Sequence, residues 1–333
     1  MTIEKIRVSI GSAAVLGLVE NIKLKDPPTT CYIMTYKEGH CLANCGFCPQ
    51  AREAKGSTER LSRVIWPVFP LKDFLTKLKY TAPLKKFKRI CIQTLNYSRN
   101  IDDLEELILQ IRKVSNIPFS VAIPPISKEK MNRLRILGVE RVGIALDAAT
   151  PELFNKIKGY NGGGPYKWED HFRALKNALE IFSRYLVSTH LIVGLGETQK
   201  NLVELLYKLK KMGVLTSLFA FTPIKGTRLE TYKKPDLLEY RKVQLARYLI
   251  YNEDKELKDF TFNLKGEIVK INITKSDLKF IVENTSAFET VGCPGCNRPY
   301  YTSKPSGPIY NYPRKLTPEE MEDIYTQLKM FVN

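Results

Sequence analysis

Three cysteines fall close together near the start of the chain, in the run Cys41-Leu-Ala-Asn-Cys45-Gly-Phe-Cys48-Pro-Gln. Thiolates at these spacings can bind three irons of a [4Fe-4S] cube from one short loop. A ferredoxin-type cluster needs a nearby fourth cysteine, which the loop lacks, and zinc sites usually draw their ligands from two short hooks. The loop therefore predicts a [4Fe-4S] cluster that keeps one iron without a protein ligand.

An iron without a protein ligand can bind the amino and carboxylate groups of S-adenosylmethionine (SAM). The loop, with an aromatic residue directly before its third cysteine, resembles that of the radical SAM superfamily. The resemblance implies that Cys41, Cys45 and Cys48 are the catalytic cluster ligands. It also implies that Phe47 packs against the adenine of SAM.

Length, apolar content and net charge limit the possible fold classes and partners. The chain has 333 residues, 44% of them hydrophobic, which is enough for one large α/β domain. Its formal net charge of +17 favours an acidic partner, namely nucleic acid, a membrane surface or an acidic carrier protein. A lysine-rich surface that only keeps the protein soluble explains this charge equally well.

Two further features predict a cytoplasmic location. The apolar stretch at residues 12–19 is too short to span a membrane and lacks a typical signal-peptide cleavage site. The chain has seven cysteines, and because three of them form a metal-type cluster, they fit a reducing compartment better than a disulfide framework.

The cluster loop has to be positioned by the elements around it. Residues 1–30 form a partly helical lead-in that ends at Asp26-Pro27-Pro28, and the segment Cys31–Lys37 predicts a strand that leads directly into the loop. If the face of that strand that carries Cys31 is interior, this thiol lies below the loop.

Strands and helices then alternate, which predicts parallel strands with crossover helices and hence a complete or partial β/α (TIM-like) barrel at 31–265, followed by a C-terminal extension at 266–333. The further strands are predicted at Arg89–Thr94, Phe119–Ile123, Arg141–Asp147, Leu186–Val193, Leu215–Thr222 and Asp259–Leu264. The helices are predicted at Leu71–Tyr80, Asp102–Val114, Lys128–Leu137, Pro151–Lys158, Trp168–Ser183, Gln199–Met212 and Pro235–Tyr251, with a last helix from Thr317 to Val332. Asp102, Thr150 and Thr198 are the predicted N-caps of three of these helices.

Three segments narrow the resemblance to biotin synthase and its relatives. They are Ile192-Val-Gly-Leu-Gly-Glu-Thr198 at the fifth strand, the turn Thr222-Pro-Ile-Lys-Gly-Thr-Arg-Leu229, and Leu146-Asp147 at the fourth strand. Gly194 and Gly196 would let the backbone approach a ligand, and Glu197 and Asp147 would make polar contacts to SAM or substrate. The alternatives are an ordinary β/α turn for the glycines and a structural N-cap for Asp147.

The sequence also departs from biotin synthase. That enzyme holds a second cluster with cysteines from three barrel strands and an arginine, but here only Cys91 stands at a matching place. Ser188 replaces another of those cysteines, the third strand has none, and Phe262-Asn263 occupy the expected arginine region. These differences argue against that [2Fe-2S] cluster and against biotin synthase itself.

The C-terminal extension has the hook Cys293-Pro-Gly-Cys296, a common metal-binding turn. With Cys31 and Cys91 it completes four cysteines outside the first loop, which predicts an auxiliary [4Fe-4S] cluster deep in or beneath the barrel. The alternatives are a zinc site or redox dithiol at the hook and a purely apolar role for Cys91. A serine, Ser303 or Ser306, would then be the fourth ligand.

The tail Cys293-Pro-Gly-Cys-Asn-Arg-Pro-Tyr-Tyr301, followed by Tyr310-Asn-Tyr-Pro313, is similar to that of the archaeal lipoyl synthases, which act as a pair of radical SAM proteins. This resemblance implies sulfur insertion at carbon 6, carbon 8 or both of an octanoyl chain on a carrier lysine. A SAM-derived 5′-deoxyadenosyl radical would remove hydrogen, and the auxiliary cluster would give up the sulfur.

The implied partners are an octanoylated lipoyl carrier domain (glycine cleavage H protein or dehydrogenase E2 subunit), a second radical SAM subunit and an electron donor such as ferredoxin. No membrane partner is expected. The basic charge could also point to nucleic acid, but the sequence contains no basic module interleaved with aromatic residues and no appended binding domain, which argues against it. The alternative activity is a radical SAM reaction on another small molecule or on RNA. A non-enzymatic iron-sulfur carrier is a third possibility, which a SAM cleavage assay separates from the others.

Overall fold

A central eight-stranded sheet organises the molecule, which a computed structural model describes for residues 3–333. Six neighbouring strands run parallel, from β10 through β9, β8, β7 and β6 to β2. Their bounds are β2 Thr30–Thr35, β6 Arg89–Gln93, β7 Phe119–Ala122, β8 Val139–Gly143, β9 Val187–Val193 and β10 Leu215–Ala220. The sheet is open, with β10 at one edge, so it forms a partial barrel.

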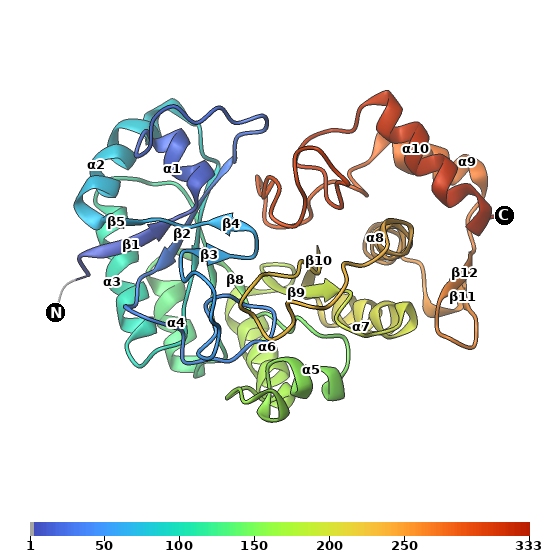
Figure 1. The fold of residues 1–333 in the computed structure, drawn as a ribbon, viewed down its shortest axis with the longest axis horizontal. Coiled ribbons are helices and arrows are strands. Elements are labelled where there is room, and N and C mark those ends of the chain that lie inside the picture. Colours follow the sequence, from blue (N-terminus) through green and yellow to red (C-terminus); the bar gives the residue numbers. More distant parts are fainter. Residues whose placement is uncertain (1–2) are drawn as a thin grey trace.

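Amphipathic helices connect the parallel strands and cover the outer face of the sheet, as Figure 1 shows. Thr150 and Thr198 cap two of them, and both caps were predicted because a hydroxyl there can accept a hydrogen bond from a backbone N–H in the first turn. The crossover helices are α2 Leu71–Thr81, α3 Asn100–Arg112, α4 Lys128–Ile136, α5 Pro151–Ile157, α6 Trp168–Phe182 and α7 Gln199–Met212, with α8 Leu237–Asn252 after β10.

The α/β fold with parallel strands is confirmed. The predicted N-cap Asp102 is wrong, because α3 already begins at Asn100, and β8 begins and ends earlier than predicted. The strand predicted at 259–264 is β11 Phe260–Phe262, but it pairs only with β12 Ile268–Ile271 in a separate hairpin.

Residues 3–30, predicted as a lead-in before the barrel, contribute a strand to the central sheet. Strand β1 Lys5–Val8 joins the sheet antiparallel to β2, and β5 Val68–Pro70 pairs with its other side. Helix α1 Ile10–Leu16 follows β1, and the short hairpin β3 Arg60–Leu61 and β4 Val64–Ile65 follows the cysteine loop. The sheet therefore begins before the Pro27-Pro28 turn.

The C-terminal extension folds back on the barrel. Helices α9 Lys275–Asn284 and α10 Pro318–Leu328 pack together beside α8, and the segment between them reaches back over the strands (Figure 1). Helix α9 was not predicted. None of the helices in residues 3–333 is both long and apolar enough to cross a membrane.

The two faces of the sheet have different surroundings. The outer face packs against the helices in the main hydrophobic core, which includes Cys31 and Ile33. The inner face carries Tyr32, Cys91 and Ser120 side by side, because the register pairs Tyr32 with Cys91 and Cys91 with Ser120. This inner face is where the candidate site lies.

Candidate functional site

A cavity of about 310 Å³ lies against the inner face of the sheet. Six of the seven cysteines line it, in two groups of three: Cys41, Cys45 and Cys48 from the first loop, and Cys91, Cys293 and Cys296 from β6 and the tail. The first loop follows the C-terminal end of β2, whereas the tail turn contacts its N-terminal end at Thr30. The two groups therefore occupy opposite ends of one cavity.

Backbone hydrogen bonds hold the first loop in shape. The Cys41 N–H donates to the Gln50 carbonyl at 2.8 Å and closes the loop, and the Gly46 N–H donates to Ile157 at the end of α5. The Gly46 carbonyl accepts from Leu229, which belongs to the turn noted above for its similarity to biotin synthase. A side chain at Gly46 would collide with Arg228, 2.8 Å from its Cβ position.

Cys41 is buried, and Cys45 and Cys48 are half-buried, among polar groups that suit thiolates. The Cys41 Sγ accepts hydrogen bonds from the Asn96 N–H at 3.1 Å and the Ala43 N–H at 3.4 Å. Burial raises the pKa of the Cys45 thiol to about 12, although the nearby Lys158 ammonium opposes this. A thiol in such a place loses its proton readily only when a metal binds it.

Phe47 and Asp147, the predicted SAM contacts nearest the loop, both line the cavity. Asp147 is not free, because Lys158 donates to its Oδ2 at 2.7 Å and to the Ala145 carbonyl at 2.8 Å. Both side chains of this pair are at most 10% exposed. Lys158 also lines the cavity, and sequence reasoning missed it because its position at the end of α5 gives no signal of its partner across the turn.

Gly194, Gly196 and Glu197 lie differently from the prediction. None of them lines the cavity. The Glu197 carboxylate accepts hydrogen bonds from the backbone N–H groups of Gly194 and Leu195 at 2.7 and 3.0 Å, so it stabilises its own loop. The two glycines have φ values of 102° and 122°, which side chains rarely adopt, and this is a sufficient reason for glycine there. We therefore retain only Phe47 and Asp147 as candidate SAM contacts.

The second group joins two distant parts of the chain, β6 and the tail, and Ser120 and Tyr32 contact its tail thiols. Ser120 Oγ donates to Cys293 Sγ at 3.2 Å, and the Tyr32 hydroxyl lies 3.4 Å from Cys296 Sγ. Cys91 lines the cavity together with Cys293 and Cys296. Burial raises the pKa of the Cys91 thiol, and the neighbouring Cys293 and Cys296 add to this rise. Cys91 thus belongs to the group.

The tail is fixed to the start of β2 by a dense set of hydrogen bonds. The Gly295 carbonyl, inside the Cys-x2-Cys turn, accepts from the hydroxyls of Thr29 at 2.6 Å and Thr30 at 2.9 Å. The Asn297 side chain accepts from the Thr29 N–H and donates to the Pro27 carbonyl, both at 3.0 Å. These bonds place the two tail thiols against the inner face of the sheet.

Two parts of the predicted ligand set are wrong. Cys31 is fully buried on the outer face, packed in the helix-covered core, and does not line the cavity. Neither predicted serine lines it: Ser303 Oγ accepts from the Tyr310 N–H, and Ser306 is exposed. The serine that does lie against the second group is Ser120.

Further polar groups line the wall between the two ends. His190 lies beside Phe219, and burial together with the Arg298 guanidinium lowers the His190 pKa to about 4, so the imidazole is neutral at physiological pH. Arg298 lies over the Phe219 ring, 4.2 Å from its centre, and its buried Nε has no hydrogen-bond partner. An unpartnered buried donor facing a cavity suits a bound acceptor.

The donor set of each group fits an iron-sulfur cluster. Within residues 3–333, no three or more His, Cys, Asp or Glu side chains converge closely enough to hold a single metal ion. Each thiolate of a cubane binds a different iron, so cluster ligands need not meet at one point.

The chain belongs to the radical SAM superfamily, whose family model matches residues 39–209, just over half of its length. Membership implies a [4Fe-4S] cluster and SAM, and the first cysteine loop lies within the matched part. The curated relatives include biotin synthases from Methanococcus aeolicus, 26% identical over 60% of this chain and 57% of that protein, and from Parabacteroides distasonis, 24% identical over 60% and 58%. The chain thus spans under three fifths of the length of these relatives.

Solved structures show the same fold. A methylornithine synthase superimposes with a TM-score of 0.52 at 16% identity, over 67% of this chain and 61% of that one. The hydrogenase maturase HydG from Carboxydothermus hydrogenoformans gives 0.54 at 15% identity, over 92% and 58%. These likenesses support the partial barrel as the fold of this protein.

Proposed function

We propose that this protein is a radical SAM sulfurtransferase of the lipoyl synthase type, which inserts sulfur at carbon 6, carbon 8 or both of an octanoyl chain carried on a lysine. The observation that carries the proposal is the single cavity with two groups of three thiols at its opposite ends. A reaction that joins sulfur to an unactivated carbon needs a radical source and a sulfur source within reach of one substrate, and two such groups meet that need.

The cysteines present would hold two clusters. Cys41, Cys45 and Cys48 would bind the first cluster, and Cys91, Cys293 and Cys296 the second, an auxiliary [4Fe-4S] cluster. When bound, the first cluster with SAM supplies the radical that removes hydrogen, and the second supplies sulfur.

The rest of the cavity would position and protect the substrate. Along β2, Tyr32 lies beside Cys296 and Thr35 ends the strand, so roughly 10 Å of strand separates the two ends. An extended acyl chain fits between them. Apolar residues of the wall include Met34 of β2, Ala122 of β7 and Phe219 of β10, which would exclude water from a reactive carbon.

The biotin synthase relatives support sulfur insertion, whereas the chain's own tail cysteines distinguish it from them. The proposed partners are an octanoylated lipoyl carrier domain, a second radical SAM subunit and a ferredoxin-like electron donor.

The test is to supply reconstituted protein with SAM, a strong reductant and either an octanoylated carrier domain or an octanoyl-lysyl peptide. Mass spectrometry should detect product with one or two added sulfurs, and the Cys293→Ala variant should still cleave SAM but make none. Formation of 5′-deoxyadenosine without thiolated product from the wild type would contradict the proposal.

A further inference from the structure

A group of positively charged side chains lies at the edge of the cavity. We call the set Arg60, Arg63, Lys234 and Lys304 the basic rim. Arg60 begins β3 and Arg63 is in the turn between β3 and β4, Lys234 precedes α8, and Lys304 is in the tail. Arg60, Lys234 and Lys304 are exposed and Arg63 is half-buried.

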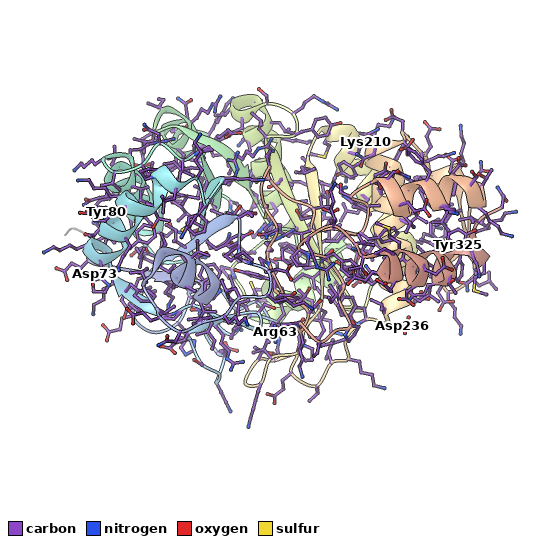
Figure 2. The ribbon with its side chains drawn as sticks, turned by 90° about the horizontal axis from the view of Figure 1, so that it is seen from above. Arg63, Asp73, Tyr80, Lys210, Asp236 and Tyr325 are labelled. Carbon is purple, nitrogen blue, oxygen red and sulfur yellow. The ribbon has the colours of Figure 1, made fainter. Side chains whose placement is uncertain are left out.

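The structure brings these three segments together. Arg63 Nη1 donates to the tail carbonyls of Tyr300 at 2.9 Å and Ser303 at 2.7 Å. The charges of Arg63 and Lys304 lower the Lys234 pKa, in addition to the larger effect of its partial burial. The tail also contacts the residue after Lys234, because the Tyr310 hydroxyl donates to the Pro235 carbonyl at 2.7 Å. In Figure 2, Arg63 and Asp236 both lie in the lower half of the view, whereas Lys210 lies in the upper half.

The basic rim lies beside the wall of the cavity. Leu61 and Ser62, which follow Arg60 and precede Arg63, line the cavity, and so does Thr302, two residues before Lys304. The Ser62 hydroxyl donates to the Tyr301 carbonyl at 3.1 Å, so the hairpin and the tail meet at the cavity wall. A partner bound to the rim would therefore reach the cavity directly.

The rim's charges are not neutralised within the described chain. None of its four residues forms an ion pair with any of residues 3–333. Three exposed acids lie in the neighbouring segments: Glu59 is next to Arg60, Asp236 caps α8, and Glu230 accepts from the Gly226 N–H. The four cations of the rim outnumber these acids, so the rim carries a net positive charge that an anionic partner would complement.

We propose that the basic rim is the docking surface for an acidic face of the carrier domain that presents the octanoyl-lysine. This inference rests on the proposed function, and it assigns recognition of the carrier to the charge of the basic rim and recognition of the acyl chain to the cavity. Docking by exposed charges acts mainly on encounter and affinity, so it depends on ionic strength.

The experiment compares two double variants of the loaded full-length protein. Lys234→Glu/Lys304→Glu reverses two rim charges that form no hydrogen bond or ion pair of their own side chains. The control Lys265→Glu/Lys270→Glu makes the same change in net charge on the exposed β11–β12 hairpin, at the far right in Figure 1.

At low salt we expect the rim variant to raise the KM for the octanoylated carrier domain by about tenfold or more and to leave kcat unchanged. Its KM for an octanoyl-lysyl peptide and its SAM cleavage without substrate should match the control, and its defect should shrink as salt rises. Equal KM values for the carrier in the two double variants would overturn the proposal.

Carrier binding is also titrated directly, so that the result does not depend on turnover. If the wild type thiolates neither substrate, the proposed function fails, whereas rim-dependent carrier binding would still support docking. If the rim variant loses binding of a short RNA but binds the carrier as the control does, the rim serves nucleic acid and the inference is wrong.

Discussion

The chain builds the two groups of thiols in the cavity in different ways. The first comes from one loop of eight residues, 41–48, whose own backbone hydrogen bonds and neighbours fix it. The second joins Cys91 in β6 to Cys293 and Cys296, about two hundred residues later, and depends on a tail that reaches back to the start of β2. The first group is therefore a local structure, and the second exists only when the whole chain is folded.

This difference suggests a division of roles. A local loop can bind its cluster as soon as the barrel has formed, whereas the second group is closed by a C-terminal segment that has to dock on the start of β2 through hydrogen bonds. If the proposed function is right, the group that must give up sulfur is also the one whose protein cage is easier to open.

The largest expected effects are on SAM cleavage and on sulfur transfer, and they should distinguish the two groups of thiols completely. Replacing Cys41, Cys45 or Cys48 by alanine should abolish SAM cleavage, because the cluster that binds SAM loses a ligand. Cys293→Ala or Cys296→Ala should leave cleavage intact and stop sulfur transfer. Chromatography of 5′-deoxyadenosine and mass spectrometry of the carrier measure the two outcomes, and thiolated product from either tail variant would disprove the assignment of the second group.

The next comparison concerns the two remaining cysteines. Cys91→Ala should remove most of the iron of the second cluster, about four irons per chain, because its thiol faces the cavity. Cys31→Ala, the matched control on the opposite face of the sheet, should keep the full iron content. Iron and acid-labile sulfide assays decide this, and loss of iron in the Cys31 variant would restore that residue to the ligand set.

A smaller effect is expected at the buried pair beside the first loop. Lys158→Met leaves the Asp147 carboxylate buried without its partner and should lower the free energy of unfolding by about 3–5 kcal/mol. The double variant Asp147→Asn/Lys158→Met removes the stranded charge and should recover much of that loss. Urea denaturation of the cluster-free protein measures both, and equal stability of the single variant and the wild type would show that the pair is open to solvent.

The smallest effect is expected at the tail. Asn297→Ala removes two hydrogen bonds to the lead-in and should make local opening of the tail easier by about 1–3 kcal/mol. Hydrogen exchange of residues 290–312 should become faster, while exchange in the first cysteine loop stays unchanged. Asn284→Ala on exposed α9 is the control, and equal exchange in the two variants would mean that other contacts hold the tail.

Much of the fold could be predicted because the barrel is built from local patterns. Apolar periodicity located α7 at the residues observed, and the strand that leads into the cysteine loop is β2. The pattern could not place β1, because a strand of four residues in a lead-in gives too little periodicity to be recognised, and its pairing with β2 and β5 is tertiary.

The candidate site was predictable where ligands are adjacent in sequence and much less so where they are not. The spacing of the first loop identified its three cysteines directly. The alternation of β2 grouped Cys31 with Ile33 but could not say which face is interior, since both faces of a parallel sheet are buried. Ser120 and Lys158 carried no signal at all, because their roles come from neighbours that only the folded chain supplies.

The most direct test of whether each group of three cysteines binds a [4Fe-4S] cluster is to measure iron and acid-labile sulfide per chain. Anaerobically reconstituted wild type is compared with two triple-alanine variants. Two clusters predict about eight irons in the wild type and about four in each of the Cys41/Cys45/Cys48 and Cys91/Cys293/Cys296 variants. About four irons in the wild type, falling to none in the first variant and unchanged in the second, would contradict the presence of two clusters.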